Sequence, residues 1–382
     1  MHADRVRGEP AYFPSLTGLR GVAAGWVMVL HLWMLGGGPQ VQPFGIRLTP
    51  LFYGGGLGVD LFFVLSGFLL GLPFLAWAQG RRPFPNLARF WKRRCLRVLP
   101  AYWIQLLLLI GAGWIASHHS PVTGWQFLAY LSMEFVFVPG ISPLLNGVWW
   151  SLPVEWNFYL ILPLLGLGFQ RLRGIAMLVL GLAAAVALRF YCYGLLLDGR
   201  MEGLFSYPTI IQLPGRIDQF VFGMAGAWLH LRGGVPPRWR TAALLGGIVG
   251  LCLFLWMPDQ RGDIFGEADV PWIFWHASVI GAIWGLVVYG AAGEGRLARI
   301  LLASRAMAFL GTVSYGLYLW HAIVFNVAYR AGLMQWKPAT SLPLLALMLV
   351  PVALLVAWIS FRLTERPFLV TEPAAHQPSV VA

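Results

Sequence analysis

The chain has 382 residues, of which 58% are hydrophobic and 11% are charged, and its mean hydropathy is +0.70. This composition leaves too little polar surface for a soluble globular protein of that length, so it excludes a soluble fold and indicates a membrane protein. The formal net charge of +12 does not indicate nucleic-acid binding, because the basic residues lie in loops between hydrophobic segments, where membrane orientation accounts for them. The three cysteines, Cys95, Cys192 and Cys252, are too scattered to predict a disulfide framework or a metal site.

Apolar stretches long enough to cross a bilayer recur from residue 15 to residue 361, since a crossing helix needs roughly 20 apolar residues. We therefore predict an all-α fold, a polytopic membrane helix bundle of about ten transmembrane helices. Residues 1–14 form a cytoplasmic N-terminal segment, residues 15–368 one membrane domain, and residues 369–382 a flexible C-terminal tail. The predicted crossings are residues 15–36, 56–77, 98–117, 149–169, 174–197, 207–231, 241–257, 271–292, 307–329 and 342–361.

One further apolar segment, residues 125–138, is short for a crossing and is expected to be re-entrant or interfacial. Without it, both termini are cytoplasmic and most Lys and Arg residues lie on the cytoplasmic side, as the positive-inside rule requires. An eleventh crossing would place Arg171, Arg173 and the basic residues of 232–240 outside. The ten-crossing topology puts an acidic segment, residues 259–269, on the outer side. Its outer loops contain few basic residues, namely Arg47, Arg200, Arg261, Arg330 and Lys337.

Two ionisable residues, Arg20 and His31, lie eleven positions apart in the first predicted crossing. Eleven residues of helix rotate roughly 20° beyond three full turns and rise about 16 Å, so both side chains share one face. Such a face suits a long donor molecule whose anionic head lies at Arg20 and whose reactive acyl group lies at His31. In the alternative interpretation, Arg20 reaches to the membrane interface and His31 is a hydrogen-bonded packing residue.

Several other predicted helices place ionisable or hydroxyl side chains in one layer, in the outer half of the membrane. A charged side chain inside a bilayer costs at least ~3 kcal/mol, so each one needs a partner, an aqueous cavity or a function. The layer therefore predicts a buried reaction or transport site, with static ion pairs as the alternative. Its members are Asp60, Glu155, Arg189, Arg216, Asp218, Ser314, Tyr318 and His321.

A cluster of basic residues precedes the third predicted crossing. One interpretation is an orientation anchor attracted to anionic lipid. In the other, Arg94 and Arg97 lie one helical turn apart, and paired guanidinium groups suit phosphate or carboxylate, so they complete a clamp for nucleotide phosphates with Arg20 and the neighbouring Arg93. The cluster contains Arg89, Lys92, Arg93, Arg94 and Arg97.

The segment 16–31, LTGLRGVAAGWVMVLH, resembles the opening of the acyltransferase-3 family of membrane acyltransferases, whose signature is a basic residue and a histidine separated by ten positions. The resemblance runs from about residue 15 to residue 368. One departure is Thr17, which stands where the family usually has an aspartate. The other matching segments are GVDLFFVLSGFLL from Gly58, RFWKRRCLRVLPAYW from Arg89, VWWSLPVEWNFYLILP from Val148, VSYGLYLWH from Val313 and LTERPF from Leu363.

The resemblance implies an enzyme of the inner (plasma) membrane that transfers an acetyl or other short acyl group from acyl-CoA, without a metal. The acceptor would be a hydroxyl of a sugar or glycosylated molecule: cell-envelope polysaccharide, lipopolysaccharide or a secondary metabolite such as a macrolide. The family's essential basic residue and histidine carry over to Arg20 and His31, its arginine pair to Arg94 and Arg97, and its acidic position to Glu155.

In the mechanism that we expect, acyl-CoA enters from the cytoplasm and the arginines hold its phosphates. His31 deprotonates the acceptor hydroxyl or briefly carries the acyl group, while Asp60 or Glu155 orients the imidazole. The remaining candidates contact the substrates: Ser66 and Tyr315 at the thioester carbonyl, Trp149 and Trp150 on a sugar arriving from the outer side, and His321 and Arg216 elsewhere in the site. Interfacial anchoring is the alternative for the two tryptophans.

Two other functions fit parts of the pattern. A membrane transporter or proton-coupled carrier would use the buried charges as a relay and would not consume an acyl donor, but no inverted repeat is visible in the sequence. A non-catalytic scaffold or receptor gives no reason for Arg20 and His31 to share a helix face.

Overall fold

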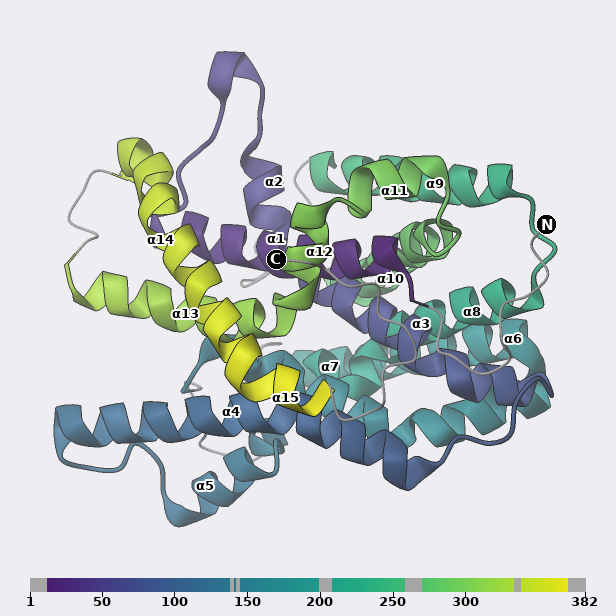
Figure 1. The fold of residues 1–382 in the computed structure, drawn as a ribbon, viewed down its shortest axis with the longest axis horizontal. Coiled ribbons are helices and arrows are strands. Elements are labelled where there is room, and N and C mark those ends of the chain that lie inside the picture. The colour runs from purple at the N-terminus through teal and green to yellow at the C-terminus, as the bar shows by residue number, and fades with distance from the viewer. Residues whose placement is uncertain are drawn as a thin grey trace.

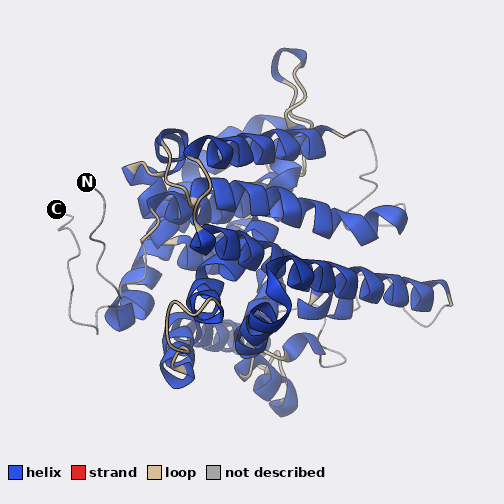
Figure 2. Ribbon diagram, turned by 90° about the vertical axis from the view of Figure 1, so that its right-hand side faces the viewer, coloured by secondary structure: helices blue, strands red, loops and turns tan. Residues whose placement is uncertain are grey.

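The computed structural model describes residues 12–137, 141, 145–198, 208–257, 270–332 and 338–369. Within these ranges the chain forms helices joined by loops, without a strand, which confirms the all-α prediction (Figures 1 and 2). Nearly all of the predicted N-terminal segment and C-terminal tail lies outside the described residues, as do the acidic segment 259–269 and the outer-loop residues Arg200, Arg261 and Lys337.

The long helices are α1 Pro14–Leu35, α3 Leu57–Ala78, α4 Leu87–Ser117, α6 Leu152–Leu197, α8 Leu213–Arg232, α9 Pro237–Trp256, α10 Val270–Ala291, α13 Ser314–Arg330 and α14 Pro338–Ser360. Shorter helices lie between them: α2 Thr49–Tyr53, α5 Gly124–Leu131, α7 Pro208–Ile211, α11 Arg296–Leu302, α12 Arg305–Thr312 and α15 Arg366–Leu369. A 3₁₀ turn, Gly147–Ser151, precedes α6, and a π-helical turn, Phe361–Glu365, follows α14.

In the described part of the chain, eight segments are long and apolar enough to cross a membrane, and nine if the bent pair α12 and α13 forms one span. The 46-residue α6 contains two of the predicted crossings. It folds back on itself, because a Cβ at Gly168 would lie 2.7 Å from the sulfur of Met177, which a straight helix would hold about 13 Å further along. The chain is therefore a multi-pass membrane protein.

The sixth predicted crossing, residues 207–231, corresponds to α8. Polar residues such as Arg216 and Asp218 lower its hydropathy, so it is not among the apolar spans. It packs against α3, α6 and α10, and this enclosure by protein accounts for polar side chains in a helix of membrane length. Segment 125–138 overlaps α5, whose eight residues extend about 12 Å, too short for a crossing.

Close contact between α3 and α8 depends on two glycines. A Cβ at Gly67 would overlap the carbonyl oxygen of Phe220, and a Cβ at Gly223 would overlap that of Val64. The helices thus approach backbone to backbone, as small residues allow in membrane bundles. α1 packs against α3, α12 and α13, so Arg20 and His31 lie within the bundle.

Candidate active site

A cavity of about 240 Å³ lies among α1, α3, α4, the start of α6 and α13. Three guanidinium groups and one carboxylate line it, which gives the lining an excess of positive charge. Because such charges are costly inside a membrane protein, an anionic ligand is the natural occupant. The polar lining residues are Arg20, Ser66, Arg94, Arg97, Ser151, Glu155, Tyr159, Tyr315 and Tyr318.

The arginine clamp comes from two helices. Arg20 lies on α1, and Arg94 and Arg97 share a face of α4, which begins at Leu87 because the side chain of Asn86 accepts a hydrogen bond from the Arg89 backbone N–H at 2.9 Å. The basic cluster is therefore helical, because α4 begins eleven residues before the predicted start of the crossing at residue 98.

None of the ion pairs between described residues involves these three arginines. Arg20 and Arg97 are close enough to repel each other, and the Nε atom of Arg94 is buried without a hydrogen-bond partner. Predicted to belong to the same clamp, Arg93 is exposed and does not line the cavity. The structure thus brings together Arg20, Arg94 and Arg97.

Glu155 enters the cavity from the first turn of α6. Asn146 caps the preceding 3₁₀ turn by accepting a hydrogen bond from the Val148 N–H at 3.3 Å, and a carboxylate near a helix N-terminus is favoured by the helix dipole. The hydroxyl of Ser66 on α3 donates a 2.6 Å hydrogen bond to Oε1 of Glu155. Glu155 also interacts electrostatically with Arg20.

His31 adjoins the cavity without lining it. Its Nδ1 lies 2.9 Å from the carbonyl oxygen of Val27 and 3.2 Å from Nε2 of His321, which is fully buried. The cavity reaches Tyr318, whose ring centroid is 6.2 Å from that of His321. Tyr318 is thus a residue of the cavity lining that also lies close to the histidine pair.

The two tyrosines of α13 that line the cavity have fixed hydroxyl groups. Tyr315 donates to the carbonyl of Val98 at 2.8 Å, and Tyr318 donates to the carbonyl of Val148 at 2.8 Å. Since the proton of Tyr318 is used there, Ser151 must be the donor in the 2.6 Å bond between the two hydroxyl groups. The hydroxyl proton of Tyr315 is thus used in the bond to Val98 and is not free to polarise a thioester carbonyl.

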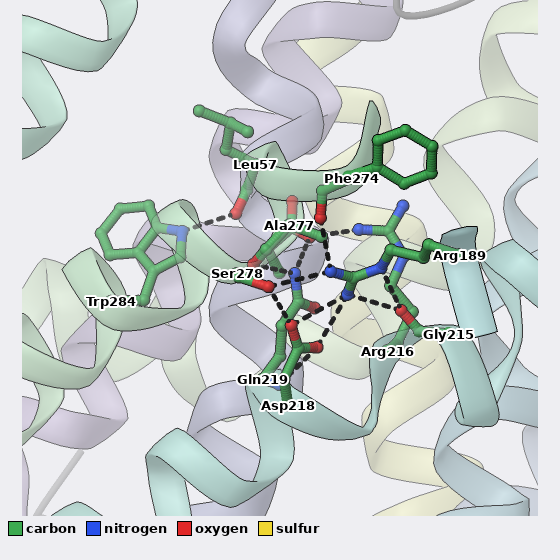
Figure 3. Close-up of polar contacts among 11 residues, drawn as sticks. Leu57, Arg189, Gly215, Arg216, Asp218, Gln219, Phe274, Ala277, Ser278 and Trp284 are labelled. Carbon is green, nitrogen blue, oxygen red and sulfur yellow. Dashed lines mark hydrogen bonds and ion pairs between the residues drawn. The ribbon is translucent and has the colours of Figure 1, made fainter. Parts of the chain in front are cut away.

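Asp60 and Arg216 belong to a different polar network. Oδ1 of Asp60 accepts hydrogen bonds from Arg216 at 3.0 Å and from Gln219 at 2.6 Å. The neighbouring Arg189 binds both carboxylate oxygens of Asp218 at 2.9 Å (Figure 3).

Arg189 also donates to the carbonyl oxygens of Gly215 and Phe274 and to the hydroxyl of Ser278, which in turn donates to Asp218. This network ties together α3, α6, α8 and α10. Asp60 is thus committed to Arg216 and Gln219, while Glu155 is bonded to Ser66. Neither carboxylate forms the expected hydrogen bond with His31.

The surroundings of Trp149 and Trp150 differ from those expected of rings that stack on a sugar. Trp149 is fully buried, donates from Nε1 to Gln105 at 2.6 Å, and packs against the ring of Tyr102 at a centroid distance of 4.8 Å. It has no exposed face on which a sugar could stack. Trp150 is partly buried, and its carbonyl accepts a 2.8 Å hydrogen bond from Gln212.

Glu365 has no role in the site predicted from the sequence. This residue is 2% exposed, lies in the π-helical turn Phe361–Glu365, and interacts electrostatically with Arg97 and Arg20. The signal was present, since Glu365 stands in the LTERPF segment directly after the last apolar stretch. The last predicted crossing ends at residue 361, so Glu365 lies outside the predicted intramembrane charges.

Comparison with known proteins decides the family. The acyltransferase-3 profile, described as an acyltransferase domain, matches residues 13–362. The chain belongs to the acyltransferase-3 family. It is therefore an acyltransferase that transfers groups other than aminoacyl groups, as the resemblance implied.

Two curated relatives of this acyltransferase are similar along most of its length. It is 25% identical over 392 residues to the peptidoglycan O-acetyltransferase OatA of Listeria monocytogenes, covering 95% of this chain but only 56% of OatA. It is 26% identical over 327 residues to the exopolysaccharide production protein ExoZ of Rhizobium meliloti, covering 82% of this chain and 90% of ExoZ. No solved structure matches the acyltransferase.

Proposed function

We propose that this acyltransferase transfers an acetyl or other short acyl group from acyl-CoA to a hydroxyl of a sugar-containing acceptor in the cell envelope, and that it does so in the inner membrane. The observation that carries the proposal is the convergence of Arg20, Arg94 and Arg97 on one cavity. No ion pair between described residues involves these arginines, so they are available to an anion. The phosphates of coenzyme A match that requirement, because guanidinium groups bind phosphate oxygens in bidentate fashion.

The positive-inside rule orients the donor. Arg94 and Arg97 belong to the basic cluster that this rule places on the cytoplasmic side, where acyl-CoA is available. His31 lies about 16 Å further along α1 than Arg20, toward the outer side. With its phosphates at the arginines and its thioester beyond Tyr318, acyl-CoA would extend through the cavity as far as His31.

His31 acts as the base in the direct route. It takes the proton of the acceptor hydroxyl while the oxygen attacks the thioester carbonyl carbon. The tetrahedral intermediate then collapses, the carbon–sulfur bond breaks, and the departing coenzyme A thiolate takes the acceptor's proton from the imidazolium. In the alternative route the acyl group passes through His31 before it reaches the acceptor.

The names of the relatives support a glycan acceptor. OatA is named as a peptidoglycan O-acetyltransferase and ExoZ as an exopolysaccharide production protein, so both names refer to sugar polymers. The transporter alternative is weakened because buried charges that would form its relay are closed ion pairs. Arg189 pairs with Asp218 (Figure 3), and Arg216 pairs with Asp60.

A transfer assay tests the proposal. Purified protein in lipid nanodiscs is incubated with acetyl-labelled acetyl-CoA and with peptidoglycan fragments, exopolysaccharide or lipopolysaccharide, and label in the acceptor is measured. We expect transfer by the wild type, loss in His31→Ala, and no change in His119→Ala, which alters an exposed histidine of the α4–α5 connection. Full activity of His31→Ala would overturn the proposed base, and the absence of transfer by the wild type would overturn the reaction.

A further inference from the structure

The two imidazole rings of His31 and His321 form a pair between α1 and α13. Their centroids are 5.0 Å apart, and the Nε2 atom of His321 lies 3.2 Å from the Nδ1 atom of His31. His321 is fully enclosed, with Phe325 packed edge-on at a centroid distance of 5.8 Å. Its ring therefore has little freedom to turn away from His31.

Carbonyl oxygens near the pair assign its protons. A carbonyl oxygen only accepts hydrogen bonds, so the Nδ1 of His31, 2.9 Å from Val27, carries a proton. The Nδ1 of His321 lies 2.8 Å from the Leu317 carbonyl and carries one for the same reason. A neutral imidazole has a single N–H, so the Nε2 of each ring holds a lone pair.

In the hydrogen bond between the two rings, His31 is then the donor and His321 the acceptor. The Nδ1–H of His31 is shared between the Val27 carbonyl and the lone pair of His321 Nε2. If His321 were protonated at Nε2, two N–H groups would face each other at this position and the hydrogen bond would be lost. The geometry therefore fits a neutral His321 that acts as an acceptor.

We propose that His321 is the positioning residue for His31, in the role that a carboxylate has in a serine hydrolase triad. Together with the Val27 carbonyl, it favours the tautomer of His31 whose Nε2 is basic, and it stabilises the imidazolium that forms when Nε2 takes the acceptor proton. The proton then leaves from Nε2 of His31 to the coenzyme A thiolate, so His321 never changes its own protonation. This inference rests on the proposed function, in which His31 is the base.

A neutral partner suits this location. A carboxylate beside His31 would be a buried charge whenever the imidazole is neutral, which costs at least a few kcal/mol inside a membrane. An imidazole acceptor carries no charge in the resting state. The cost of a buried charge beside His31 is consistent with the bonding of the two carboxylates to other residues. Asp60 is bonded to Arg216, and Glu155 is bonded to Ser66.

Three substitutions separate positioning from packing. His321→Gln retains an acceptor near the position of Nε2, His321→Asn reaches only the position of Nδ1, and His321→Met fills the space without an acceptor. In the transfer assay with full-length protein in nanodiscs, we expect Gln to keep kcat within about 10-fold and Asn and Met to lose about 100-fold or more. The KM for acetyl-CoA should stay unchanged, because the phosphates bind at the arginines.

A spectroscopic readout keeps the test independent of turnover. In nanodisc protein labelled with ¹⁵N-histidine, the His31 signals are assigned by their loss in His31→Ala. We expect the Nδ1–H tautomer in the wild type and in His321→Gln, and a mixture of tautomers in His321→Met. If Met does not yield a monodisperse protein, the comparison of Gln with Asn decides.

Equal kcat losses in Gln and Asn, or an unchanged His31 tautomer in the Met or Asn variant, would overturn the positioning role. Absence of transfer by the wild type, with the tautomer shift still present, would instead overturn the reaction and leave the pair intact. These two failures are thus distinguishable.

Discussion

The hydroxyl of Ser66 donates a 2.6 Å hydrogen bond to Oε1 of Glu155 and so joins α3 to the first turn of α6 inside the cavity. Glu155 and Arg20 line the same cavity and interact electrostatically, so the bond fixes a carboxylate in the field of the cation that we assign to the donor phosphates. An oxygen that moves freely there would compete with phosphate for the same guanidinium group. The Ser66 bond therefore keeps Glu155 in place without occupying Arg20.

Ser66→Ala removes that donor. A hydrogen bond to a charged group contributes about 1.5–3 kcal/mol, and its loss frees Glu155 to swing toward Arg20. We expect the KM for acetyl-CoA to rise about 10-fold, while Ser66→Thr, which keeps the hydroxyl, stays near the wild type. Steady-state transfer kinetics check this, and equal KM values for Ala and wild type would contradict it.

Arg20→Gln tests the phosphate clamp directly. Each charge-assisted contact that is lost should raise the KM for acetyl-CoA about 10-fold or more. Acetyl-pantetheine has no phosphate, so its transfer should be the same in wild type and variant. Arg94→Gln and Arg97→Gln should behave likewise.

The matched control for this clamp is Arg89→Gln, which alters an exposed member of the same basic cluster and should leave both donors unaffected. If Arg20→Gln impaired transfer from acetyl-pantetheine as strongly as transfer from acetyl-CoA, the arginine would not be a phosphate ligand.

Arg189→Met tests the network of Figure 3 as a structural element. Removing one partner of a buried ion pair costs about 3–5 kcal/mol, because Asp218 is left unpaired among α6, α8 and α10. We expect a lower melting temperature in detergent and a partial recovery in the double variant Arg189→Met/Asp218→Leu. A double variant less stable than Arg189→Met alone would show that each side chain stabilises the fold independently.

Residues on one helix were predictable from the sequence, because helical geometry alone places them. The eleven-residue spacing of Arg20 and His31 puts both on α1, and the three-residue spacing of Arg94 and Arg97 brings both into one cavity. A long apolar stretch marks a crossing for a similar local reason, and most of the predicted crossings have a long helix in the structure.

Partners on different helices carried no such local signal. Asp60 pairs with Arg216 across 156 positions, and His31 pairs with His321 across 290. Which charges meet depends on how α3 packs on α8 and α1 on α13, so a shared predicted depth did not identify the pairs. α8 shows the same limit, since hydropathy cannot show that α3, α6 and α10 enclose its polar side chains.

Glu365→Gln tests whether this carboxylate tunes the clamp. Glu365 offsets part of the positive charge of Arg97 and Arg20, so its neutralisation should make the site more attractive to phosphate. We expect coenzyme A to bind about 5-fold more tightly in calorimetry and kcat to fall by a similar factor, because product release slows when the product is held more tightly. Glu134→Gln serves as the control, since Glu134 accepts a hydrogen bond from Asn157 and does not line the cavity. Weaker binding of coenzyme A by Glu365→Gln would show instead that the carboxylate positions the arginines, and its effect on affinity would then have the opposite sign.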